Sequence, residues 1–454
     1  MPTHLIQPLP YFEDSAVLFS SIAGRPWAVF LDSGHPSSQQ GRFDILACDP
    51  LTTLVTDGGL TKIVKDGIEQ FSPVDPFTLL KQELPNIPPA GDLPFNCGAI
   101  GYFGYDLAKR IEKLPELAFD AEQIPEMAVG IYHWAVIIDH QQQQSWLVSF
   151  GISDAESQRL FAQFSRSPLV DHRVEFSVTG KIVSNMDHHG YELAFNKIKH
   201  YLLEGDCYQV NLAQRFEAPC QGDTWTAYRL LRESNAAPFS AYLNHPELQI
   251  LCSSPERFLK VTQTRVETKP IKGTRPRKQD PLEDQAQIEA LSESRKDQAE
   301  NVMIVDLLRN DISKNCREGS VKVPSLFAVE SYATVHHLVS TVTGELAEGQ
   351  HALDLLRSCF PGGSITGAPK IRAMEIIEEL EPHRRGVYCG AIGYIGFDGN
   401  MDTNIVIRTL VHSRNTIRCW AGGGIVNDSV FEEEYQESFD KAEALLQVLR
   451  DRMT

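Results

Sequence analysis

Val266-Glu-Thr-Lys-Pro-Ile-Lys-Gly-Thr-Arg-Pro-Arg-Lys278 is a basic stretch interrupted by two prolines, and we expect the rest of the chain to be organised around it. Pro270 and Pro276 fix φ and lack a backbone donor, so neither a long helix nor a central strand can run through the stretch. Gly273 lets the backbone turn directly after Lys272. The pattern predicts a stiff turn that presents the Lys272 amine as a nucleophile or an anion clamp, with a basic surface loop as the alternative.

The composition is that of an ordinary globular protein, because 42% of the 454 residues are hydrophobic and 22% are charged. This length predicts two domains or one double-lobed unit. A net charge of -18 argues against nucleic acid as a partner, and an anionic substrate would need a locally positive pocket. Nine cysteines without a CxxC pair favour reduced, buried thiols. The sequence has no signal-peptide pattern and no apolar run of about 20 residues, so we expect a cytoplasmic protein that does not enter a membrane.

Strand-like and helix-like patterns are unevenly distributed along the chain. Most runs before residue 180 are typical of strands, whereas helical periodicity is strong at 191–204, 283–308 and 432–450. Because strands and helices do not alternate regularly, we expect an α+β fold with mostly antiparallel sheets. The weakly patterned polar region near 165–185 separates a predicted N-terminal lobe, 1–165, from a second region, 185–454.

A nine-residue near-repeat links the two parts of the chain. Gly98-Ala-Ile-Gly-Tyr-Phe-Gly-Tyr-Asp106 returns as Gly390-Ala-Ile-Gly-Tyr-Ile-Gly-Phe-Asp398. One such copy is too little for a repeat protein. The near-repeat predicts that each lobe contributes a similar strand with regularly spaced glycines, and that these strands lie in facing sheets. The alternative is that the two segments resemble each other only by coincidence of composition.

Two pairs of acidic residues have helical spacing. Asp297 and Glu300 share one helix face, as do Glu434 and Glu437. Brought together, the two pairs would present the oxygen ligands that Mg²⁺ prefers, although each pair alone is more typical of a solvated helix face. Lys441, one turn after Glu437, suits either an ion pair or a substrate clamp.

Glycine-rich turns and two charged residues in apolar runs are further candidates. The segment 362–370 lacks the spacing of a phosphate-binding loop, but its backbone amides could hold a carboxylate. The glycines of Gly422-Gly-Gly424 would let the backbone approach a ligand closely. For both segments, the alternative is a tight connection between packed elements. Arg408 lies in an apolar, strand-like run and needs a carboxylate partner, which a substrate can supply. For His337, patterning leaves a core role and a binding role open.

Together these motifs resemble those of the chorismate-utilising enzymes, the family of anthranilate synthase large subunits, isochorismate and salicylate synthases, and aminodeoxychorismate synthases. The matching segments cover most of the chain: 98–106, 254–258, 306–311, 337–340, 363–370 and 422–441. Anthranilate synthases typically have alanine where this chain has Lys272, so the segment 270–274 resembles the aminodeoxychorismate synthase branch. The resemblance implies a two-lobed fold with antiparallel sheets facing each other and helices outside.

The resemblance also implies roles for individual residues. Lys272 would be the nucleophile and Glu256 the acid that protonates the leaving hydroxyl, and the four helical carboxylates would form a Mg²⁺ site in which the shorter Asp297 acts through water. The implied substrate-binding residues are Tyr388, Arg408 and Gly422 for the enolpyruvyl carboxylate, Ser364, Gly424 and Lys441 on the ring-carboxylate side, His337 at the ring, and Thr274 beside the nucleophile.

The chemistry implied is the amination of chorismate to 4-amino-4-deoxychorismate for 4-aminobenzoate and folate synthesis. A neutral Lys272 amine would attack C2, and ammonia would displace it by adding at C4. Gln209 stands where relatives that add water have a lysine base, so isochorismate formation is disfavoured. An anthranilate synthase large subunit and a non-catalytic binding subunit are the alternatives.

Ammonia needs a source, because the chain lacks the Gly-x-Cys-x-Gly turn of class I glutamine amidotransferases. The family therefore implies a separate glutamine amidotransferase subunit as partner. The N-terminal lobe of the family can also hold tryptophan, and the candidate pocket here consists of Ser33, Pro238, Phe239 and Ser240.

Overall fold

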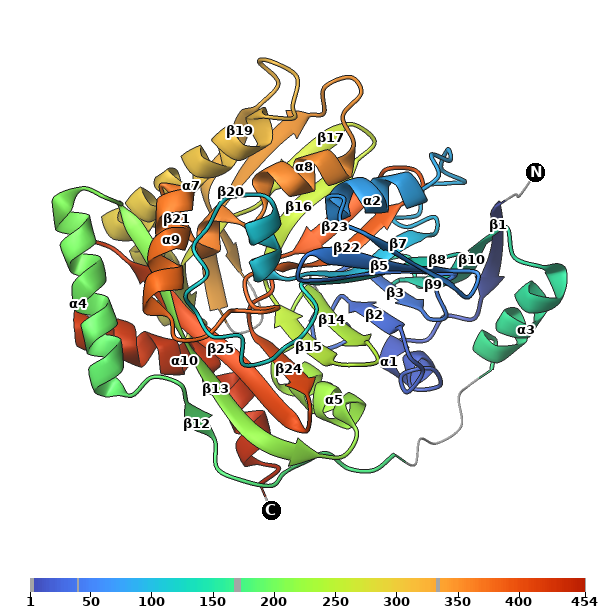
Figure 1. Ribbon diagram of the computed structural model, residues 1–454, viewed down its shortest axis with the longest axis horizontal. Coiled ribbons are helices and arrows are strands. Elements are labelled where there is room, and N and C mark those ends of the chain that lie inside the picture. The colour runs from blue at the N-terminus through green and yellow to red at the C-terminus, as the bar shows by residue number, and fades with distance from the viewer. Residues whose placement is uncertain (1–3, 39–40, 167–172, 332–334, 454) are drawn as a thin grey trace.

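Two large antiparallel β-sheets lie at the centre of the computed structural model, which describes residues 4–38, 41–166, 173–331 and 335–453 (Figure 1). The first sheet has the strand order β1 (His4–Leu9), β10 (Gln144–Phe150), β9 (Trp134–Asp139), β3 (Phe43–Ala47), β2 (Ala28–Asp32), β14 (Phe239–Asn244), β15 (Gln249–Ser254), β24 (Thr409–Ser413), β25 (Thr416–Ile425), β13 (Gln209–Gln221) and β11 (Ser177–Val178). Two short strands also pair with β13, namely β12 (Val183–Ser184) and β21 (Gly367–Ala368).

The second sheet lies opposite the first. Its strand order is β18 (Ile271–Pro276), β20 (Val335–Glu345), β17 (Arg265–Thr268), β16 (Arg257–Thr262), β23 (Met401–Asn404), β22 (Ala391–Gly396), β7 (Gly98–Phe103), β8 (Met127–Tyr132), β4 (Thr52–Asp57), β5 (Leu60–Lys65) and β6 (Ile68–Ser72). A further strand, β19 (Lys322–Ser331), pairs with β20.

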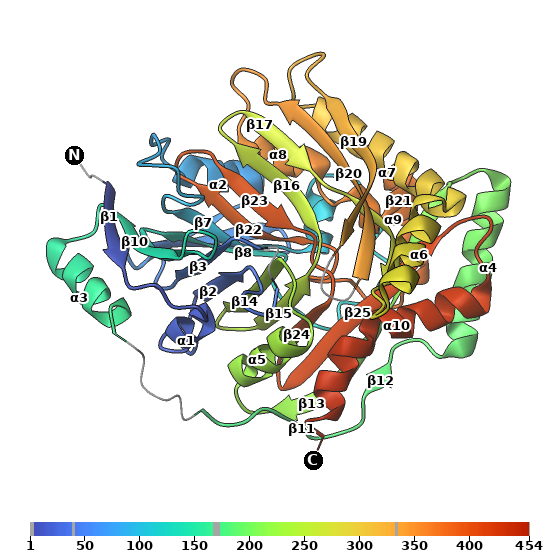
Figure 2. The ribbon, with the colours of Figure 1, turned by 180° about the vertical axis from the view of Figure 1, so that it is seen from behind.

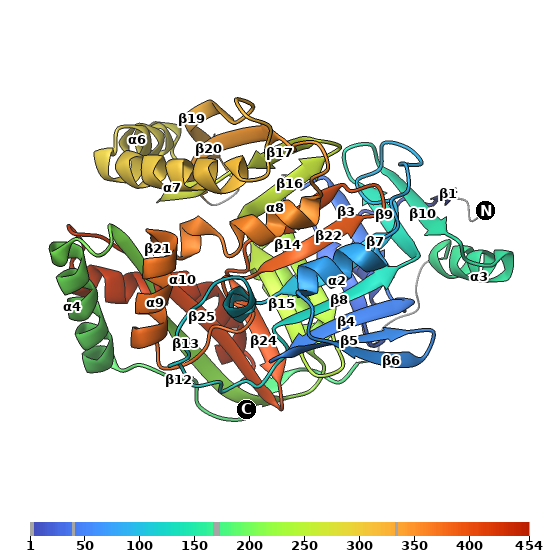
Figure 3. The ribbon, with the colours of Figure 1, turned by 45° about the horizontal axis from the view of Figure 1, so that its top comes forward.

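Helices cover the outer sides of the sheets (Figures 1 and 2). Contacts join α10 to β25 and α5 to β15 on the first sheet, and α7 to β18 and β20 on the second, where α6 and α7 form an outer layer over β19 and β20 (Figure 3). The helices are α1 (Ser15–Phe19), α2 (Pro76–Glu83), α3 (Asp154–Phe164), α4 (His188–Glu204), α5 (Thr224–Ser234), α6 (Pro281–Ser292), α7 (Arg295–Ser313), α8 (Ala352–Cys359), α9 (Lys370–Leu380) and α10 (Phe431–Arg450), with short 3₁₀ helices η1 (Tyr105–Arg110) and η2 (Gly363–Ile365).

The main hydrophobic core fills the space between the two sheets. Leu243 and Ile250 of the first sheet belong to the same buried cluster as Ile100 and Tyr394 of the second. A second cluster packs the outer side of the first sheet against helices that include α5 and α10. Removing this apolar surface from water is the main favourable term that holds the sheets face to face. The arrangement confirms the predicted α+β fold, with antiparallel sheets facing each other and helices outside.

Strands from before and after the predicted boundary share both sheets. In the first sheet β2 lies beside β14, and in the second β7 lies beside β22. Residues 167–172 of the boundary region lie outside the described part of the chain. The division into 1–165 and 185–454 stays a prediction.

The two glycine-rich near-repeats are neighbours in one sheet, so their predicted placement in facing sheets is wrong. They form β7 and β22, which pair antiparallel with Gly101 opposite Gly393. A Cβ atom on Gly393 would lie 2.1 Å from the carbonyl oxygen of Asp402, and one on Gly101 would lie 2.2 Å from that of Ala128. Glycine is therefore required at both positions by close packing of the backbones.

The basic stretch forms strands β17 and β18 instead of the predicted stiff turn. Its prolines are tolerated because β18 is the last strand of the second sheet. The pairing of β18 with β20 shifts register between Ile271 and Thr274, and Gly273 within this bulge has a φ of +83°. Lys272 therefore lies on a bulged edge strand whose backbone is fixed by β20.

Helix predictions from sequence agree well with the structure. Asp187 caps α4 by accepting a hydrogen bond from the Gly190 amide, and α4 ends at Gly205, whose φ is +80°. The predicted helical region 283–308 is broken once, between α6 and α7, where Ser294 caps α7. Within the described residues, none of these helices combines the length and the apolar character that crossing a bilayer requires.

A cavity of about 20 Å³ at η1 is lined by acidic side chains, among them Asp106, Glu122 and Glu126. Glu122 is 3% exposed, and its carboxyl oxygens have no hydrogen-bond partner among the described residues. Burial raises the pKa of Glu122 to about 8 and that of Glu126 to about 7. Glu122 therefore retains a proton at neutral pH in the folded protein.

We expect Glu122→Gln to remove a pH-dependent loss of stability. The pKa of Glu122 is about 8 when folded against an ordinary value of 4.5, so its stabilising effect is complete below pH 4.5 and is lost as the pH rises through 8. The gain in free energy of unfolding of the variant over the wild type, measured by calorimetry between about pH 6 and pH 9, should grow with pH to the order of a few kcal/mol.

The matched control is Glu116→Gln on the same connection, where the glutamate side chain is 68% exposed. This control should leave the pH dependence of stability unchanged. A Glu122→Gln variant whose stability runs parallel to that of the wild type across the pH range would contradict the assignment.

Candidate functional site

Two of the connections that carry the chain from one sheet to the other lie next to each other. The chain passes from β15 to β16 through Pro255 and Glu256, and from β23 to β24 through residues 405–408. The two crossings are joined by a hydrogen bond from the Ile405 amide to the Glu256 carbonyl, 3.0 Å long. Because both crossings break a strand, they leave Glu256 and Arg408 on connecting segments between the sheets.

A cavity of about 840 Å³ opens at these crossings, within the size range of small-molecule sites. Side chains from β18, α7, β20 and α10 line it together with the glycine-rich end of β25. It brings together every residue predicted to be catalytic, substrate-binding or metal-binding: Lys272, Glu256, Tyr388, Arg408, Ser364, His337, Gly422, Gly424, Lys441, Thr274, Asp297, Glu300, Glu434 and Glu437. Their placement is a geometric finding, and their individual roles stay predictions.

Ser364 connects the predicted nucleophile with the predicted acid. The Lys272 amine donates to the backbone oxygen of Ser364 over 3.1 Å, and the Ser364 hydroxyl donates to Glu256 Oε1 over 2.8 Å. Glu256 is buried, whereas Lys272 is half-buried at the cavity wall. One residue of η2 therefore holds both side chains against the same cavity.

Burial shifts the pKa values of these two groups towards their neutral forms. It raises the pKa of Glu256 against the opposing charges of Lys272 and Lys441, and it lowers the pKa of Lys272 against the opposing charge of Glu256. A carboxylic acid can donate a proton and a neutral amine can attack carbon. The site thus favours the protonation states that such chemistry needs.

The acidic pairs of α7 and α10 meet at this cavity, although each is held differently. Glu434 accepts a hydrogen bond from Ser429 over 2.6 Å, Glu437 pairs with Lys441 over 2.5 Å, and Asp297 pairs with Arg275 over 3.0 Å. Burial raises the pKa of Glu300 and of Glu434; burial acts the same way on Glu437, but Lys441 outweighs it, so the pKa of Glu437 is lowered.

The donor set suits a hard cation, because four carboxylates from two helices line one cavity. A Cβ atom on Gly423 would lie 3.0 Å from Glu434 Oε2 and 3.4 Å from Glu437 Oε1, so glycine there leaves these carboxylates their space. Among the described residues, however, no group of three or more His, Cys, Asp or Glu side chains is arranged to hold a metal ion directly. The carboxylates fit Mg²⁺ in chemistry and in location, but three of them are engaged in protein contacts.

Arg408 lies in the bend before β24 and not inside a strand as its apolar neighbours predicted. Its φ is +53°, a conformation that is uncommon outside glycine. Its guanidinium donates to the backbone oxygen of Lys441, and no carboxylate among the described residues forms an ion pair with it. A half-buried guanidinium without an acidic partner suits an anionic ligand.

His337 on β20 is a neutral hydrogen-bonding group. Burial lowers its pKa to about 4, and its Nδ1 lies 2.9 Å from the hydroxyl oxygen of Thr274. It is 9% exposed and lines the cavity. His337 therefore shapes the cavity without carrying charge at neutral pH.

Several lining residues were not among the sequence candidates. Trp420 stacks on Tyr388 with an interplanar angle of 7°, and Lys296, Arg275 and Asn211 add polar groups. Trp420 and Arg275 occur within stretches that attracted attention for other residues. Asn211 and Lys296 follow no motif, because only the fold turns their side chains towards the cavity.

The residues of the candidate tryptophan-binding pocket are divided between the cavity wall and the adjacent core. Pro238 lines the cavity, whereas Ser240 is a buried residue of β14 whose hydroxyl donates to the Ala237 carbonyl over 2.8 Å. Phe239 packs under the guanidinium of Arg257. The Ser33 amide donates to Asp44 over 2.7 Å, and its hydroxyl has no hydrogen-bond partner in the described part of the chain.

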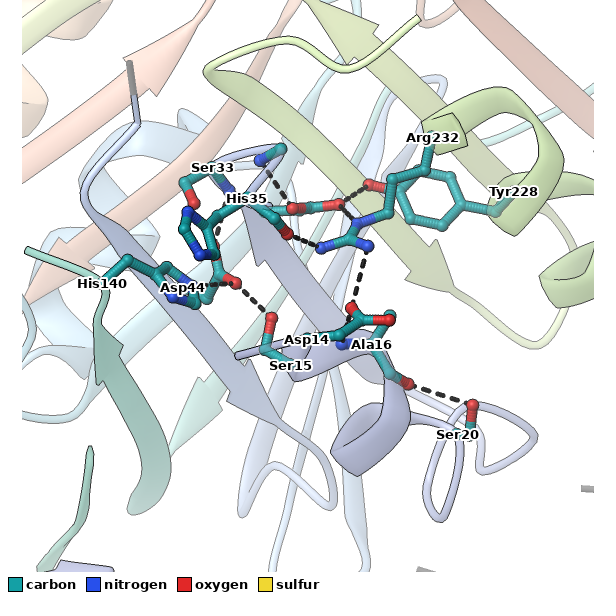
Figure 4. A network of polar contacts seen from close by, with 12 residues as sticks. Asp14, Ser15, Ala16, Ser20, Ser33, His35, Asp44, His140, Tyr228 and Arg232 are labelled. Atoms are coloured by element: carbon teal, nitrogen blue, oxygen red, sulfur yellow. Dashed lines mark hydrogen bonds and ion pairs between the residues drawn. The ribbon is translucent and has the colours of Figure 1, made fainter. Parts of the chain in front are cut away.

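Ser33 belongs to a buried polar network that joins the first sheet to α5 (Figure 4). His140 and Ser15 both contact the Asp44 carboxylate, the former over 2.8 Å, while Arg232 of α5 pairs with Asp14 over 2.9 Å. These partners fix the backbone of the candidate pocket. Tryptophan binding there stays a prediction.

Comparison with known proteins identifies the family. Residues 31–447 match the family described as chorismate binding enzyme. The chain belongs to the chorismate-binding enzymes. Aminodeoxychorismate synthase component 1 of Klebsiella aerogenes is 48% identical to this chorismate-binding enzyme over 446 residues, 97% of this chain and 98% of the relative. That of Escherichia coli (strain K12) is 50% identical over 436 residues, 95% of each chain.

More distant members are similar along most of their length. Anthranilate synthase component 1 of Bacillus caldotenax is 36% identical over 457 residues, 94% of this chain and 89% of the relative. Among solved structures, anthranilate synthase component I from Streptococcus pneumoniae TIGR4 has a TM-score of 0.78 at 32% identity and covers 89% of this chain and 92% of its own. MenF, the menaquinone-specific isochorismate synthase of Escherichia coli, has a TM-score of 0.74 at 18% identity and covers 99% and 95%, which supports the fold alone.

We expect the amine of Lys272 to react at lower pH than a surface lysine, and Glu256→Gln to lower its pKa further. Burial lowers this pKa while the Glu256 charge raises it, so removing that charge leaves burial less opposed. Competitive acylation at increasing pH, followed by peptide mass spectrometry, measures the effect with the exposed Lys278 as reference. An unchanged Lys272 titration in Glu256→Gln would show that the two groups do not interact.

Proposed function

We propose that this chorismate-binding enzyme aminates chorismate with ammonia to form 4-amino-4-deoxychorismate, a precursor of 4-aminobenzoate and folate. The observation that carries the proposal is the Lys272 amine, held with Glu256 by Ser364 in a cavity that also presents Arg408 and Lys441. The relatives at 48% and 50% identity, both named aminodeoxychorismate synthase component 1, support it.

Substrate binding follows from charge. Chorismate carries two carboxylates, and the guanidinium of Arg408 has no acidic partner among the described residues, so it would hold one of them beside Tyr388 and Gly422. The ring would lie against the neutral His337 and the side chains of β18. Ser364, Gly424 and Lys441 would face the other carboxylate.

The reaction begins with nucleophilic attack by Lys272 and protonation of the leaving hydroxyl by Glu256. The neutral Lys272 amine attacks C2, the ring double bond shifts, and the C4–oxygen bond breaks as Glu256 gives its proton to the departing hydroxyl to form water. Ammonia then adds at C4, the double bond shifts back, and the Lys272 amine leaves C2. The new C4 ammonium returns one proton to Glu256, so both side chains are restored.

Metal and partner complete the proposal. Asp297, Glu300, Glu434 and Glu437 would hold Mg²⁺, which when bound supplies positive charge for a substrate carboxylate. Ammonia would come from a glutamine amidotransferase subunit. The designation component 1 in the relatives supports a second component.

An anthranilate synthase activity is the second candidate, because anthranilate synthase component 1 of Bacillus caldotenax is 36% identical. The two functions differ in product and in the need for a covalent intermediate. Lys272 favours amination at C4, since an amine facing Glu256 in the cavity can displace the C4 hydroxyl from C2.

Incubation with chorismate, Mg²⁺ and an ammonium salt tests the function. We expect 4-amino-4-deoxychorismate by chromatography and mass, and without ammonia a covalent adduct on Lys272 by intact mass. Lys272→Ala should form no adduct and lose activity by at least about 100-fold, whereas Lys278→Ala, at an exposed position of the same stretch, should keep both. Anthranilate as main product, detected by its fluorescence, would overturn the proposal, and so would an equal adduct in Lys272→Ala.

We expect Glu300→Gln and Glu437→Gln each to lower activity by at least roughly 10- to 100-fold, the loss already typical when an outer-shell partner of a bound metal is removed. The apparent Mg²⁺ requirement should rise in both variants, because each loses one negative oxygen donor. Titration of activity with Mg²⁺ and direct Mg²⁺ binding by calorimetry provide two readouts. Glu433→Gln is the control, since Glu433 is exposed on α10 and lies outside the cavity lining; equal Mg²⁺ binding in all variants would remove the carboxylates from the site.

A further inference from the structure

The ion pair between Arg275 and Asp297 has no part in the function proposed above. Arg275 Nη2 lies 3.0 Å from Asp297 Oδ2, and Nη1 donates to the carbonyl of Thr274 on the same strand over 2.9 Å. Both residues line the cavity, and their side chains are 33% and 16% exposed. The pair therefore holds a positive charge against one of the carboxylates assigned to Mg²⁺.

The Asp297 side chain also packs against the backbone of the strand that carries Lys272. A Cβ atom on Gly273 would lie 2.9 Å from Asp297 Cγ, so glycine at this position leaves the space that the carboxyl group occupies. Gly273 follows Lys272 directly in the bulge of β18. Asp297 is thus held by β18 in two ways, through the Gly273 backbone and through the Arg275 guanidinium.

The other carboxylates of the cavity are held by nearby residues of the chain. Glu437 pairs with Lys441 on the same helix, and Glu434 accepts a hydrogen bond from Ser429, just before α10. In the described part of the chain, Asp297 is the only one of the four carboxylates whose ion pair joins two elements, α7 and β18. A change of partner at Asp297 would therefore act directly on the nucleophile strand.

We propose that Arg275 competes with Mg²⁺ for the Asp297 carboxylate, and that it lowers the affinity of the site for metal until a substrate carboxylate takes the guanidinium. The inference rests on the proposed function. Coordination of Mg²⁺ draws on the negative charge of its oxygen ligands, and the guanidinium already neutralises that charge on Asp297. A positive charge this close also repels a second cation directly.

The substrate offers Arg275 an alternative partner. Chorismate brings two carboxylates into a cavity that Arg275 lines, and the planar guanidinium matches a carboxylate with two parallel hydrogen bonds. When the guanidinium pairs with the substrate, Asp297 becomes available to the metal, directly or through water. Because such coupling is reciprocal, chorismate binding is in turn strengthened when Mg²⁺ is present. Metal and substrate therefore bind cooperatively.

The variant Arg275→Met tests the competition, because methionine keeps a long side chain and lacks the charge. We expect the Kd for Mg²⁺, measured by calorimetry without chorismate, to fall by about 3- to 10-fold, as removal of a partly exposed charge predicts. Arg275→Lys keeps the charge and should stay close to the wild type. Thermal unfolding should change little in either variant, since the Arg275 side chain is one-third exposed.

The role of the substrate is measured in a Lys272→Ala background, in which we expect no adduct to form. Saturating chorismate should strengthen Mg²⁺ binding more when Arg275 is present than in the Arg275→Met variant. The difference in Kd between these two proteins should therefore shrink when chorismate is bound. This readout follows binding alone and does not depend on turnover.

Arg277→Met is the matched control. Arg277 donates to Asp284 of α6 over 3.0 Å and lies outside the cavity lining, so this variant removes the same charge from the same basic stretch. Its Kd for Mg²⁺ should equal that of the wild type. In an Asp297→Asn background, Arg275→Met should lose most of its effect, because the carboxylate for which arginine and metal compete is absent.

The outcomes distinguish this inference from the proposed function. Equal or weaker Mg²⁺ binding in Arg275→Met would overturn the competition, and so would an equal gain in Arg277→Met. A gain that chorismate leaves undiminished would overturn the exchange of partners at Arg275. Failure of the wild-type protein to bind Mg²⁺ even with chorismate present would overturn the metal site and this inference together. Normal metal binding without 4-amino-4-deoxychorismate formation would overturn the proposed function alone.

Discussion

The contact of Lys272 and Glu256 with the same residue, Ser364, is the constraint on which the site depends. Two groups of opposite charge are brought to one wall of a partly dehydrated cavity, where burial favours the neutral amine and the neutral acid while their mutual attraction favours the ions. For both groups burial is the larger effect, so the pKa of Glu256 is raised and that of Lys272 is lowered.

The fold creates this situation where two of the chain's passages from one sheet to the other lie side by side. Glu256 lies in one crossing and Arg408 in the second, and a backbone hydrogen bond between Ile405 and Glu256 joins them. On a connecting segment, charged side chains can reach the space beside the packed sheets without displacing the core that holds the sheets together. The cavity therefore opens where strands end, and the helices α7 and α10 complete its wall with carboxylates.

Much of the site was predictable from residue types. The acidic pairs, the basic stretch around Lys272 and the glycine run all line the cavity as expected. What the patterns did not indicate is how each group is held: Asp297 pairs with Arg275, and Arg408 lies in a bend and not in a strand. The two glycine-rich near-repeats were predicted to lie in facing sheets, whereas they pair in one sheet. Glycines in a strand indicate that another backbone lies close to it, but they do not indicate which strand that is.

The sequence by itself determined the α+β class, the approximate location of three long helical regions and the set of chemically competent side chains, because capping residues, hydrophobic periodicity and charge spacing act over a few residues. Only the tertiary structure decided which of these side chains meet. Contacts such as those of Gln209 with Gly424, or of Ser364 with Lys272, join residues more than ninety positions apart in the chain, and they follow from the pairing of β13 with β25 and the packing of η2 against β18. Such long-range pairing is set by the burial of whole sheets and leaves no mark in the local sequence.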